Sequence, residues 1–184
     1  MNKKYTAPTK PKRSFKTFLF WGAIIGVTIF FIIFIVFRFV NARSVNSYDS
    51  LIQLKGEELF EKEAQTETYL VFVYSSKAEE EKEDDEFDEL VYKYITFAKK
   101  NSSKASVYNI YGFDVDNPEN HIVLITDTGE QKAVINDVDT ITDLLIYSKD
   151  VPMLLVVQGN MIYDYKDSDN SISDYLQSII EANK

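Results

Sequence analysis

The sequence predicts an α/β domain, in which helices cover a central sheet, preceded by one membrane-spanning helix. Three observations lead to this prediction. Residues 18–37 are 20 consecutive uncharged, mostly apolar residues. Residues 69–74, Y-L-V-F-V-Y, form an unbroken strand-forming run, as expected for a strand buried on both faces. Segments with helical spacing of apolar residues follow this strand and end the chain. A chain of 184 residues has room for one domain and an appendage.

The long apolar segment indicates a membrane anchor. As a helix, 20 residues extend ~30 Å, the thickness of the hydrocarbon core of a bilayer. Six basic residues precede the segment, while only Arg38 and Arg43 follow it closely, so the positive-inside rule places the N-terminus in the cytoplasm. We therefore expect a cytoplasmic basic tail at 1–16, the anchor at 17–38, a linker at 39–49 and an extracytoplasmic domain at 50–184.

A cleaved signal peptide is the competing interpretation of this segment. The apolar run is longer than the usual ~7–15 residues of a signal peptide, and it ends on Arg38 rather than on a small-residue cleavage site. Both features favour an uncleaved anchor.

Charge is segregated along the chain. All 29 acidic residues lie from Asp49 onward, with 12 lysines and no arginine, which gives this part a formal charge of −17. An acidic, arginine-free domain argues against nucleic-acid binding, which requires cations that neutralise phosphates. The chain has no cysteine, which excludes disulfides, thiolate metal sites and cysteine nucleophiles. A single histidine, His121, argues against a histidine-based zinc site.

The domain is predicted to alternate strands and helices. Apolar runs predict strands at 51–54, 69–74, 106–116, 153–157 and 161–163. Helices are expected at 57–63, 79–101, 137–147 and 171–182, and an extra hairpin at 121–135. The last helix is expected to begin with a capping box of Ser171 and Asp174.

The start of the long helix is strongly acidic. Nine of the eleven residues at 79–89 are aspartate or glutamate. A disordered tract or a calcium site would also fit this composition. However, acidic residues at the start of a helix and lysines at its end interact favourably with the helix dipole, and this segment has both. Calcium needs several oxygens that converge on one point, whereas successive helical residues point around the axis. We therefore favour a solvated helix start and expect no metal or other cofactor.

Three segments together point to a known family. Residues 69–76 end a buried strand in Y-S-S, residues 106–119 end in D-V-D-N-P-E, and residues 151–159 read V-P-M-L-L-V-V-Q-G. In order and spacing, they resemble the central strand, the following strand and the cis-proline loop of the thioredoxin superfamily. The resemblance covers about residues 48–183. It implies a mixed central sheet flanked by helices, with the hairpin at 121–135 as an insertion.

The chain departs from this family where the chemistry lies. Family oxidoreductases place C-x-x-C just after the central strand, where a helix N-terminus lowers the pKa of the first thiol. The two cysteine positions fall on Ala78 and Glu81, which cannot exchange disulfides. The hydroxyls of Ser75 and Ser76 cannot substitute, because serine has no disulfide redox couple. This departure from the family pattern excludes thiol–disulfide exchange, and we therefore expect a redox-inactive domain that is not an enzyme.

A binding surface remains. In the family, the residue before the cis-proline pairs through its backbone with an extended peptide, and such pairing needs no thiol. That residue would be Val151. The residues expected to bind a peptide or partner are Ser75, Ser76, Lys77, Ala78, Glu81, Val151, Pro152 and Met153. Retention of Pro152 only to shape the fold is the alternative.

These observations predict a single-pass protein whose extracytoplasmic domain binds an extended polypeptide or a partner protein. A chaperone-like role, or an accessory role in export or envelope assembly, would follow. The lysine-, isoleucine- and asparagine-rich composition favours a bacterial cell membrane. An endoplasmic-reticulum anchor would have the same orientation, and Asn101 would then begin a glycosylation motif. Two other functions stay open: a structural subunit of a larger membrane complex, and a divalent-metal-dependent enzyme or sensor that uses the acidic cluster at 79–89.

Overall fold

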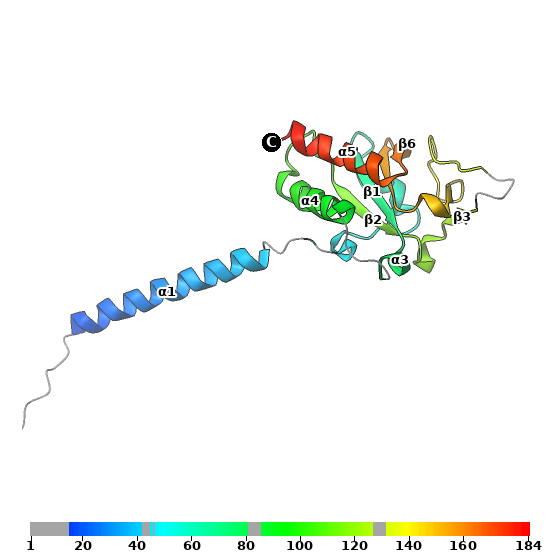
Figure 1. Cartoon of the computed structure of the whole chain (residues 1–184). Helices are drawn as coiled ribbons and strands as arrows, with labels where there is room; N and C mark the ends of the chain where they lie inside the picture. Colours follow the sequence, from blue (N-terminus) through cyan, green and yellow to red (C-terminus); the bar gives the residue numbers. More distant parts are fainter. Residues whose placement is uncertain (1–14, 42–44, 46, 81–85, 127–131) are drawn as a thin grey trace, which may run out of the picture. The chain divides into compact units, whose positions relative to one another are not determined.

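The computed structural model describes residues 15–41, 45, 47–80, 86–126 and 132–184. The chain forms two compact units, Met1–Arg43 and Ser44–Lys184. Most of the expected basic tail, residues 1–14, lies outside the described residues. Figure 1 shows the helix of the first unit and the α/β domain of the second.

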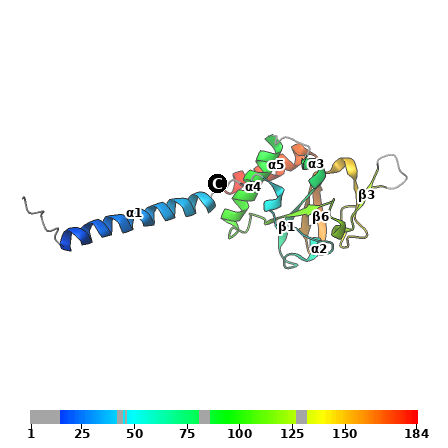
Figure 2. The same ribbon diagram turned by 90° about the horizontal axis from the view of Figure 1, so that it is seen from below.

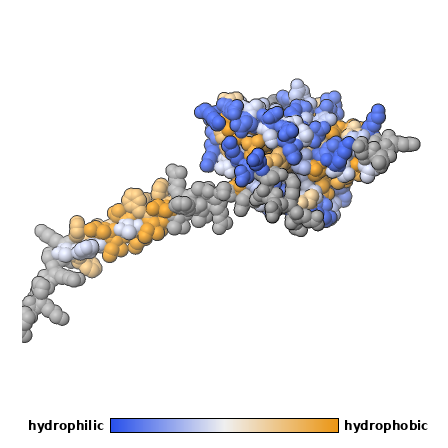
Figure 3. Space-filling model, viewed as in Figure 1, coloured by the Kyte–Doolittle hydropathy of each residue, from blue (hydrophilic) through white to orange (hydrophobic). Residues whose placement is uncertain are grey.

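The first unit contains one long apolar helix, α1 (Phe15–Asn41). Its segment Thr17–Ile35 is long and apolar enough to cross a membrane, by length and composition. The side chains of residues 18–35 are all exposed, and Figure 3 shows their apolar surface. A helical segment whose apolar side chains are exposed, as they are at residues 18–35, is suited to lipid. The expected anchor, 17–38, falls within this helix.

The second unit is built on a four-stranded mixed sheet in the order β2–β1–β5–β6. Strand β1 (Thr68–Tyr74) pairs parallel with β2 (Ile110–Asp114) and antiparallel with β5 (Met153–Gln158). Strand β5 pairs antiparallel with the edge strand β6 (Met161–Lys166). Every residue of β1 except Thr68 is buried. This confirms the prediction of a mixed sheet flanked by helices, with residues 69–74 in its interior.

Alternate residues of β1 face two separate cores. On one face, Leu70 and Phe72 pack in a core with the helices α4 (Glu86–Asn101) and α5 (Asp169–Ala182). On the other face, Val71 and Val73 pack in a core with the short helix α2 (Glu58–Glu61) and a two-stranded sheet. That sheet consists of β3 (Val123–Ile125) and β4 (Leu145–Tyr147). Figures 1 and 2 show these layers from two directions.

Both edges of the central sheet are partly covered by irregular segments. Beyond β2, the Gly112 amide donates to the Ile52 carbonyl (3.0 Å), and the Leu54 amide donates to the Gly112 carbonyl (2.9 Å). The strand expected at 51–54 is thus a single bridge between Gln53 and Gly112. Beyond β6, the Ile162 amide donates to the Val138 carbonyl (2.9 Å).

The segment between β2 and β5 differs from the prediction. The helix expected at 137–147 is wrong, because its last three residues form β4, which pairs parallel with β3. The pairing at 121–135 is also not that of a hairpin: Val134 bridges Leu145, so β4 lies between this residue and β3. Val138, Ile141 and Leu144 are buried, as their spacing suggested, but they reach the core from turns. Apolar residues spaced three positions apart can line one face of a helix or reach the core from turns, so the spacing alone does not distinguish the two structures.

Two helix starts also differ. The last helix begins at Asp169, and its capping box consists of Ser168 and Ser171, three residues before the expected pair. The helix expected at 79–101 is described as two pieces, α3 (Ser76–Glu80) and α4, and residues 81–85 lie outside the described part.

Part of the expected linker at 39–49 belongs to the folded domain. Tyr48, in the short 3-10 helix η1 (Tyr48–Ser50), is only 3% exposed. Its hydroxyl donates to the buried carboxylate of Asp88 in α4. Its ring lies 4.7 Å from that of Phe72 and 5.1 Å from that of Tyr92, measured between centroids. The compact unit accordingly begins at Ser44 rather than near residue 50.

Candidate functional site

The candidate site lies at the carboxyl ends of β1 and β2. Because these strands are parallel, with Tyr74 opposite Asp114, the segments that follow them leave the sheet at the same end. The Val115 amide donates to the Tyr74 carbonyl (2.9 Å) and extends the pairing by one step. Ser75 and Asp116 are thereby brought together at the start of α3.

Side chains from both strand ends satisfy the first amides of α3. The Ser75 hydroxyl donates to Asp116 Oδ2 (2.6 Å) and accepts from the Ala78 amide (3.2 Å). The Ser76 amide donates to Asp114 Oδ1 (3.1 Å), and the Lys77 amide donates to Asp116 Oδ2 (3.0 Å). The first amides of a helix have no partner within the helix, so these side chains act as caps.

Asp116 is held in its ionised form. The hydrogen bond from Ser75 lowers the pKa of Asp116 below its usual 3.8, and the amide and ammonium groups of Lys77 add to this effect. Lys77 Nζ lies 3.1 Å from Asp116 Oδ1, while the Lys77 side chain is 79% exposed. The chain's own carboxylate therefore occupies the position at the helix start where a negative charge is favoured.

A cavity of about 240 Å³ lies beside this network. It is lined by Ser75, Ala78, Glu79, Val115, Asp116, Leu124, Ser148, Val151 and Pro152. Small-molecule sites usually measure roughly 300–1,000 Å³, so the cavity is small for a cofactor or a metabolite. Its size is better matched to one side chain of a larger partner.

Four of the eight expected binding residues line this cavity together: Ser75, Ala78, Val151 and Pro152. Ser76 and Lys77 lie next to it in α3 but do not line it. Met153 does not line the cavity, and its side chain is fully buried in the core because it begins β5 on the inward face. Glu81 lies outside the described residues.

Val151 presents an open stretch of backbone. Its peptide bond to Pro152 is cis, and its own dihedral angles (φ −93°, ψ 127°) are extended. Among the described residues, neither its amide nor its carbonyl is hydrogen-bonded to another backbone group. An extended residue with unused backbone groups can pair with a strand from another chain.

Sequence reasoning missed five residues that line this cavity: Glu79, Val115, Asp116, Leu124 and Ser148. The alternation D-V-D at the end of β2 could have indicated Asp114 and Asp116, because the carboxyl ends of neighbouring parallel strands meet. Leu124 belongs to β3, which reaches the cavity only through its pairing with β4. No local pattern in the sequence signals that pairing.

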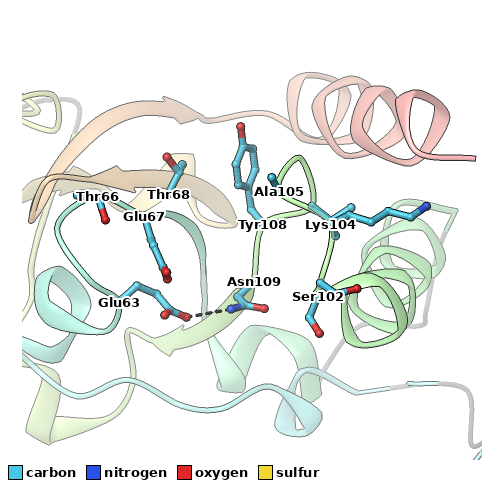
Figure 4. Close-up of a pocket in the computed structure, with 11 residues that line it drawn as sticks. Glu63, Thr66, Glu67, Thr68, Ser102, Lys104, Ala105, Tyr108 and Asn109 are labelled. Carbon is cyan, nitrogen blue, oxygen red and sulfur yellow. Dashed lines mark hydrogen bonds between the residues drawn. The ribbon is translucent and has the colours of Figure 1, made fainter.

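A second cavity, of about 470 Å³, lies at the opposite, amino end of β1 and β2. Figure 4 shows that its walls are polar and come from the turn before β1 and the loop after α4. Glu63 accepts from Asn109 Nδ2 (3.0 Å) and from the Tyr111 hydroxyl. Burial raises the pKa of Glu63, but the hydrogen bonds from Tyr111 and Asn109 outweigh burial and hold it below its usual range. Both hydrogen bonds end on Oε1 of Glu63 and join the turn before β1 to Tyr111 of β2 and to the residue before that strand.

Among the residues that the structure describes, no group of three or more histidine, aspartate or glutamate side chains converges as a metal site. Part of the acidic cluster at 79–89 lies outside those residues. No protein-family model matches the sequence, and no curated protein matches it significantly.

Proposed function

We propose that this protein is a membrane-anchored, redox-inactive, thioredoxin-like domain that binds an extended polypeptide in the cavity beside Val151. The observation behind this proposal is that segments more than 70 positions apart line one cavity. Ser75 and Ala78 come from the start of α3, and Val151 and Pro152 precede β5. These are the segments in which the resemblance to the thioredoxin superfamily implies peptide binding.

The geometry favours a polypeptide over a small molecule. The cavity is small, and Val151 beside it offers an amide and a carbonyl in extended conformation. Backbone hydrogen bonds give affinity for any extended chain, and a neighbouring pocket gives a preference for one side chain. A binding module of this kind would act on partner proteins without changing them chemically.

The residues at the start of α3 support the proposed absence of redox chemistry. The chain has no cysteine, and Ala78, which lines the cavity, carries no nucleophile. The amides that would lower the pKa of a thiol are instead capped by Ser75 and Asp116. The proposed function is therefore peptide binding in the cavity without thiol–disulfide exchange.

The proposed setting is the outer face of a cell membrane. α1 would be the anchor, and the basic residues before it would keep the N-terminus in the cytoplasm. The acidic domain would then be displayed outside the cytoplasm, where it could assist export or envelope assembly, or hold one partner in a membrane complex.

A pull-down with the intact, membrane-anchored protein tests this proposal. Ala78 is exposed, so Ala78→Trp should fill the cavity without disturbing the core. Asp174→Trp, at an exposed position of α5, is the matched control. We expect polypeptide partners to be lost from Ala78→Trp and kept by Asp174→Trp. A Val151→Asp, Pro152→Ala double variant should behave like Ala78→Trp.

The identity of the captured partners distinguishes the roles. Many unfolded clients would support a chaperone-like role, whereas one stoichiometric partner would support an assembly subunit. If folded Ala78→Trp protein keeps every partner, the cavity is not the binding site.

A further inference from the structure

We infer that the cavity selects an extended segment in which an aliphatic side chain is accompanied by a basic residue. This inference rests on the proposed polypeptide binding at the same site and specifies which polypeptides fit there. It follows from the lining of the cavity and from the charge around it.

The cavity has an apolar part that suits an aliphatic side chain. Its apolar lining residues are Ala78, Val115, Leu124, Val151 and Pro152. Leu124 is 39% exposed, although transfer of a large apolar side chain out of water is favourable. It comes from β3, so the small sheet β3–β4 supplies part of the cavity wall. A partner side chain that enters the cavity would cover Leu124.

The same cavity has an acidic part. Glu79 and Asp116 both line it, and Asp116 stays ionised because Ser75 and Lys77 stabilise its negative charge. The Lys77 side chain is largely in solvent, so its ion pair with Asp116 is screened and weak. The chain from Asp49 onward has a formal charge of −17, which attracts cationic segments and repels acidic ones.

One extended segment can contact both the apolar part and the acidic part of the cavity. Alternate side chains of a strand point to the same side. If one residue of the segment pairs beside Val151 and directs an aliphatic side chain into the cavity, the residues two positions away face the same way. A lysine or arginine there would bring its positive charge to the cavity that Asp116 and Glu79 line.

Binding of synthetic peptides to the full-length chain in nanodiscs of zwitterionic lipid tests this inference. Three fluorescent nonapeptides would be compared by anisotropy: one with Lys-Ser-Leu-Ser-Lys at its centre, one with Glu-Ser-Leu-Ser-Glu, and one with Lys-Ser-Ala-Ser-Lys. We expect the first to bind at least ~10-fold more tightly than the other two, as burial of a leucine side chain and opposite charge would produce. Empty nanodiscs control for binding to lipid.

Single substitutions would then show which residues cause the preference for leucine and which cause the preference for lysine. Leu124→Ala should reduce the preference for the leucine peptide over the alanine peptide. Val123→Ala, at a neighbouring exposed position that does not line the cavity, should leave it unchanged. Glu79→Lys should reverse or abolish the preference for lysine, and Asp174→Lys should not.

Each contrary outcome has a distinct meaning. Equal binding of all three peptides, lost in Ala78→Trp, would overturn the selectivity and support polypeptide binding at the cavity. A leucine preference that survives Leu124→Ala would overturn the assignment of the cavity. Absence of binding by all three peptides would overturn this inference, and the pull-down with Ala78→Trp would then decide separately whether the proposed function stands.

Discussion

The Ser75 hydroxyl donates a 2.6 Å hydrogen bond to Asp116 Oδ2 and so joins the end of β1 to the segment after β2. The same carboxylate oxygen accepts from the Lys77 amide at 3.0 Å. One side chain thus fixes the start of α3 against the sheet and forms part of the cavity wall. Loss of this carboxylate should affect stability and the candidate site together.

Asp116→Ala should lower the free energy of unfolding by about 1–2 kcal/mol, because it removes the acceptor for Ser75 and the cap on the Lys77 amide. Chemical denaturation of the full-length protein, followed by tyrosine fluorescence, would measure this. Asp174→Ala is the control, since an exposed aspartate should change stability by no more than about 0.5 kcal/mol. An equal effect of the two substitutions would contradict the capping role.

Acid should weaken the same network. The folded-state pKa of Asp116 lies below its ordinary 3.8, so its contribution to stability is complete above about pH 5 and is lost as the pH falls through the ordinary value toward the lower, folded value. Between about pH 5 and pH 3, the wild-type protein should therefore lose more stability than Asp116→Ala. Unfolding midpoints of the two proteins would be measured across this range. If Asp116 does not cause the loss of stability in acid, the wild-type and Asp116→Ala midpoints should fall in parallel.

Tyr48→Phe should destabilise the domain by about 1–3 kcal/mol, because the hydroxyl that donates to the buried Asp88 carboxylate is removed while the ring is kept. The hydroxyl is neutral at ordinary pH, since burial foremost, and the contact with Asp88, raise the pKa of Tyr48 far above its usual value. Tyr163→Phe, at a position 66% exposed, serves as the control. If both variants unfold at the same denaturant concentration, the segment that follows α1 is not held by this hydrogen bond.

Gly112→Ala should destabilise the domain by about 1–3 kcal/mol through crowding in the sheet. A Cβ at this position would lie 2.5 Å from Gln53 Nε2, and that amide is held by the carbonyl of Tyr48 at 3.1 Å. In a Gln53→Ala background the same substitution should cost less, because the crowding group is gone. A double-mutant cycle would measure the difference, and additive effects would show that the two positions do not interact.

Single-cysteine labelling should report the orientation in the membrane, because the wild-type chain has no cysteine. A membrane-impermeant maleimide applied to intact cells should label Asp174→Cys, which is exposed on α5. Lys4→Cys, in the basic segment, should be labelled only after permeabilisation. The opposite pattern would place the domain in the cytoplasm and refute the proposed setting.

The central part of the fold could be predicted because its signals are local. The apolar run at 69–74 is buried on both faces as β1, and the apolar face of the last helix packs on the sheet. The segment at 121–147 could not be predicted, since its structure depends on pairing between β3 and β4 across about 20 residues. Val138, Ile141 and Leu144 have the spacing of a helix, yet tertiary contacts place them in turns.

The candidate site was predictable only in part for the same reason. The resemblance suggested by the sequence led us to expect Ser75, Ala78, Val151 and Pro152 in one site, and these four residues line one cavity. Leu124 was missed because it belongs to β3, whose position is fixed by β4 rather than by its neighbours in sequence. Met153 was expected among the binding residues because the resemblance gave its position along the chain, whereas the alternation of β5 decides the direction of its side chain.

Site-specific photocrosslinking at Lys77 in intact membranes tests the central claim most directly. The Lys77 side chain is 79% exposed and lies next to the cavity without lining it, so a photoreactive phenylalanine analogue there would leave the cavity open. The same analogue at Asp174 provides the control on α5. We predict polypeptide adducts from position 77 that are absent from position 174 and are lost when Val151→Asp is added. Equal adduct formation at the two positions, or none at position 77, would contradict the claim that this cavity binds an extended polypeptide.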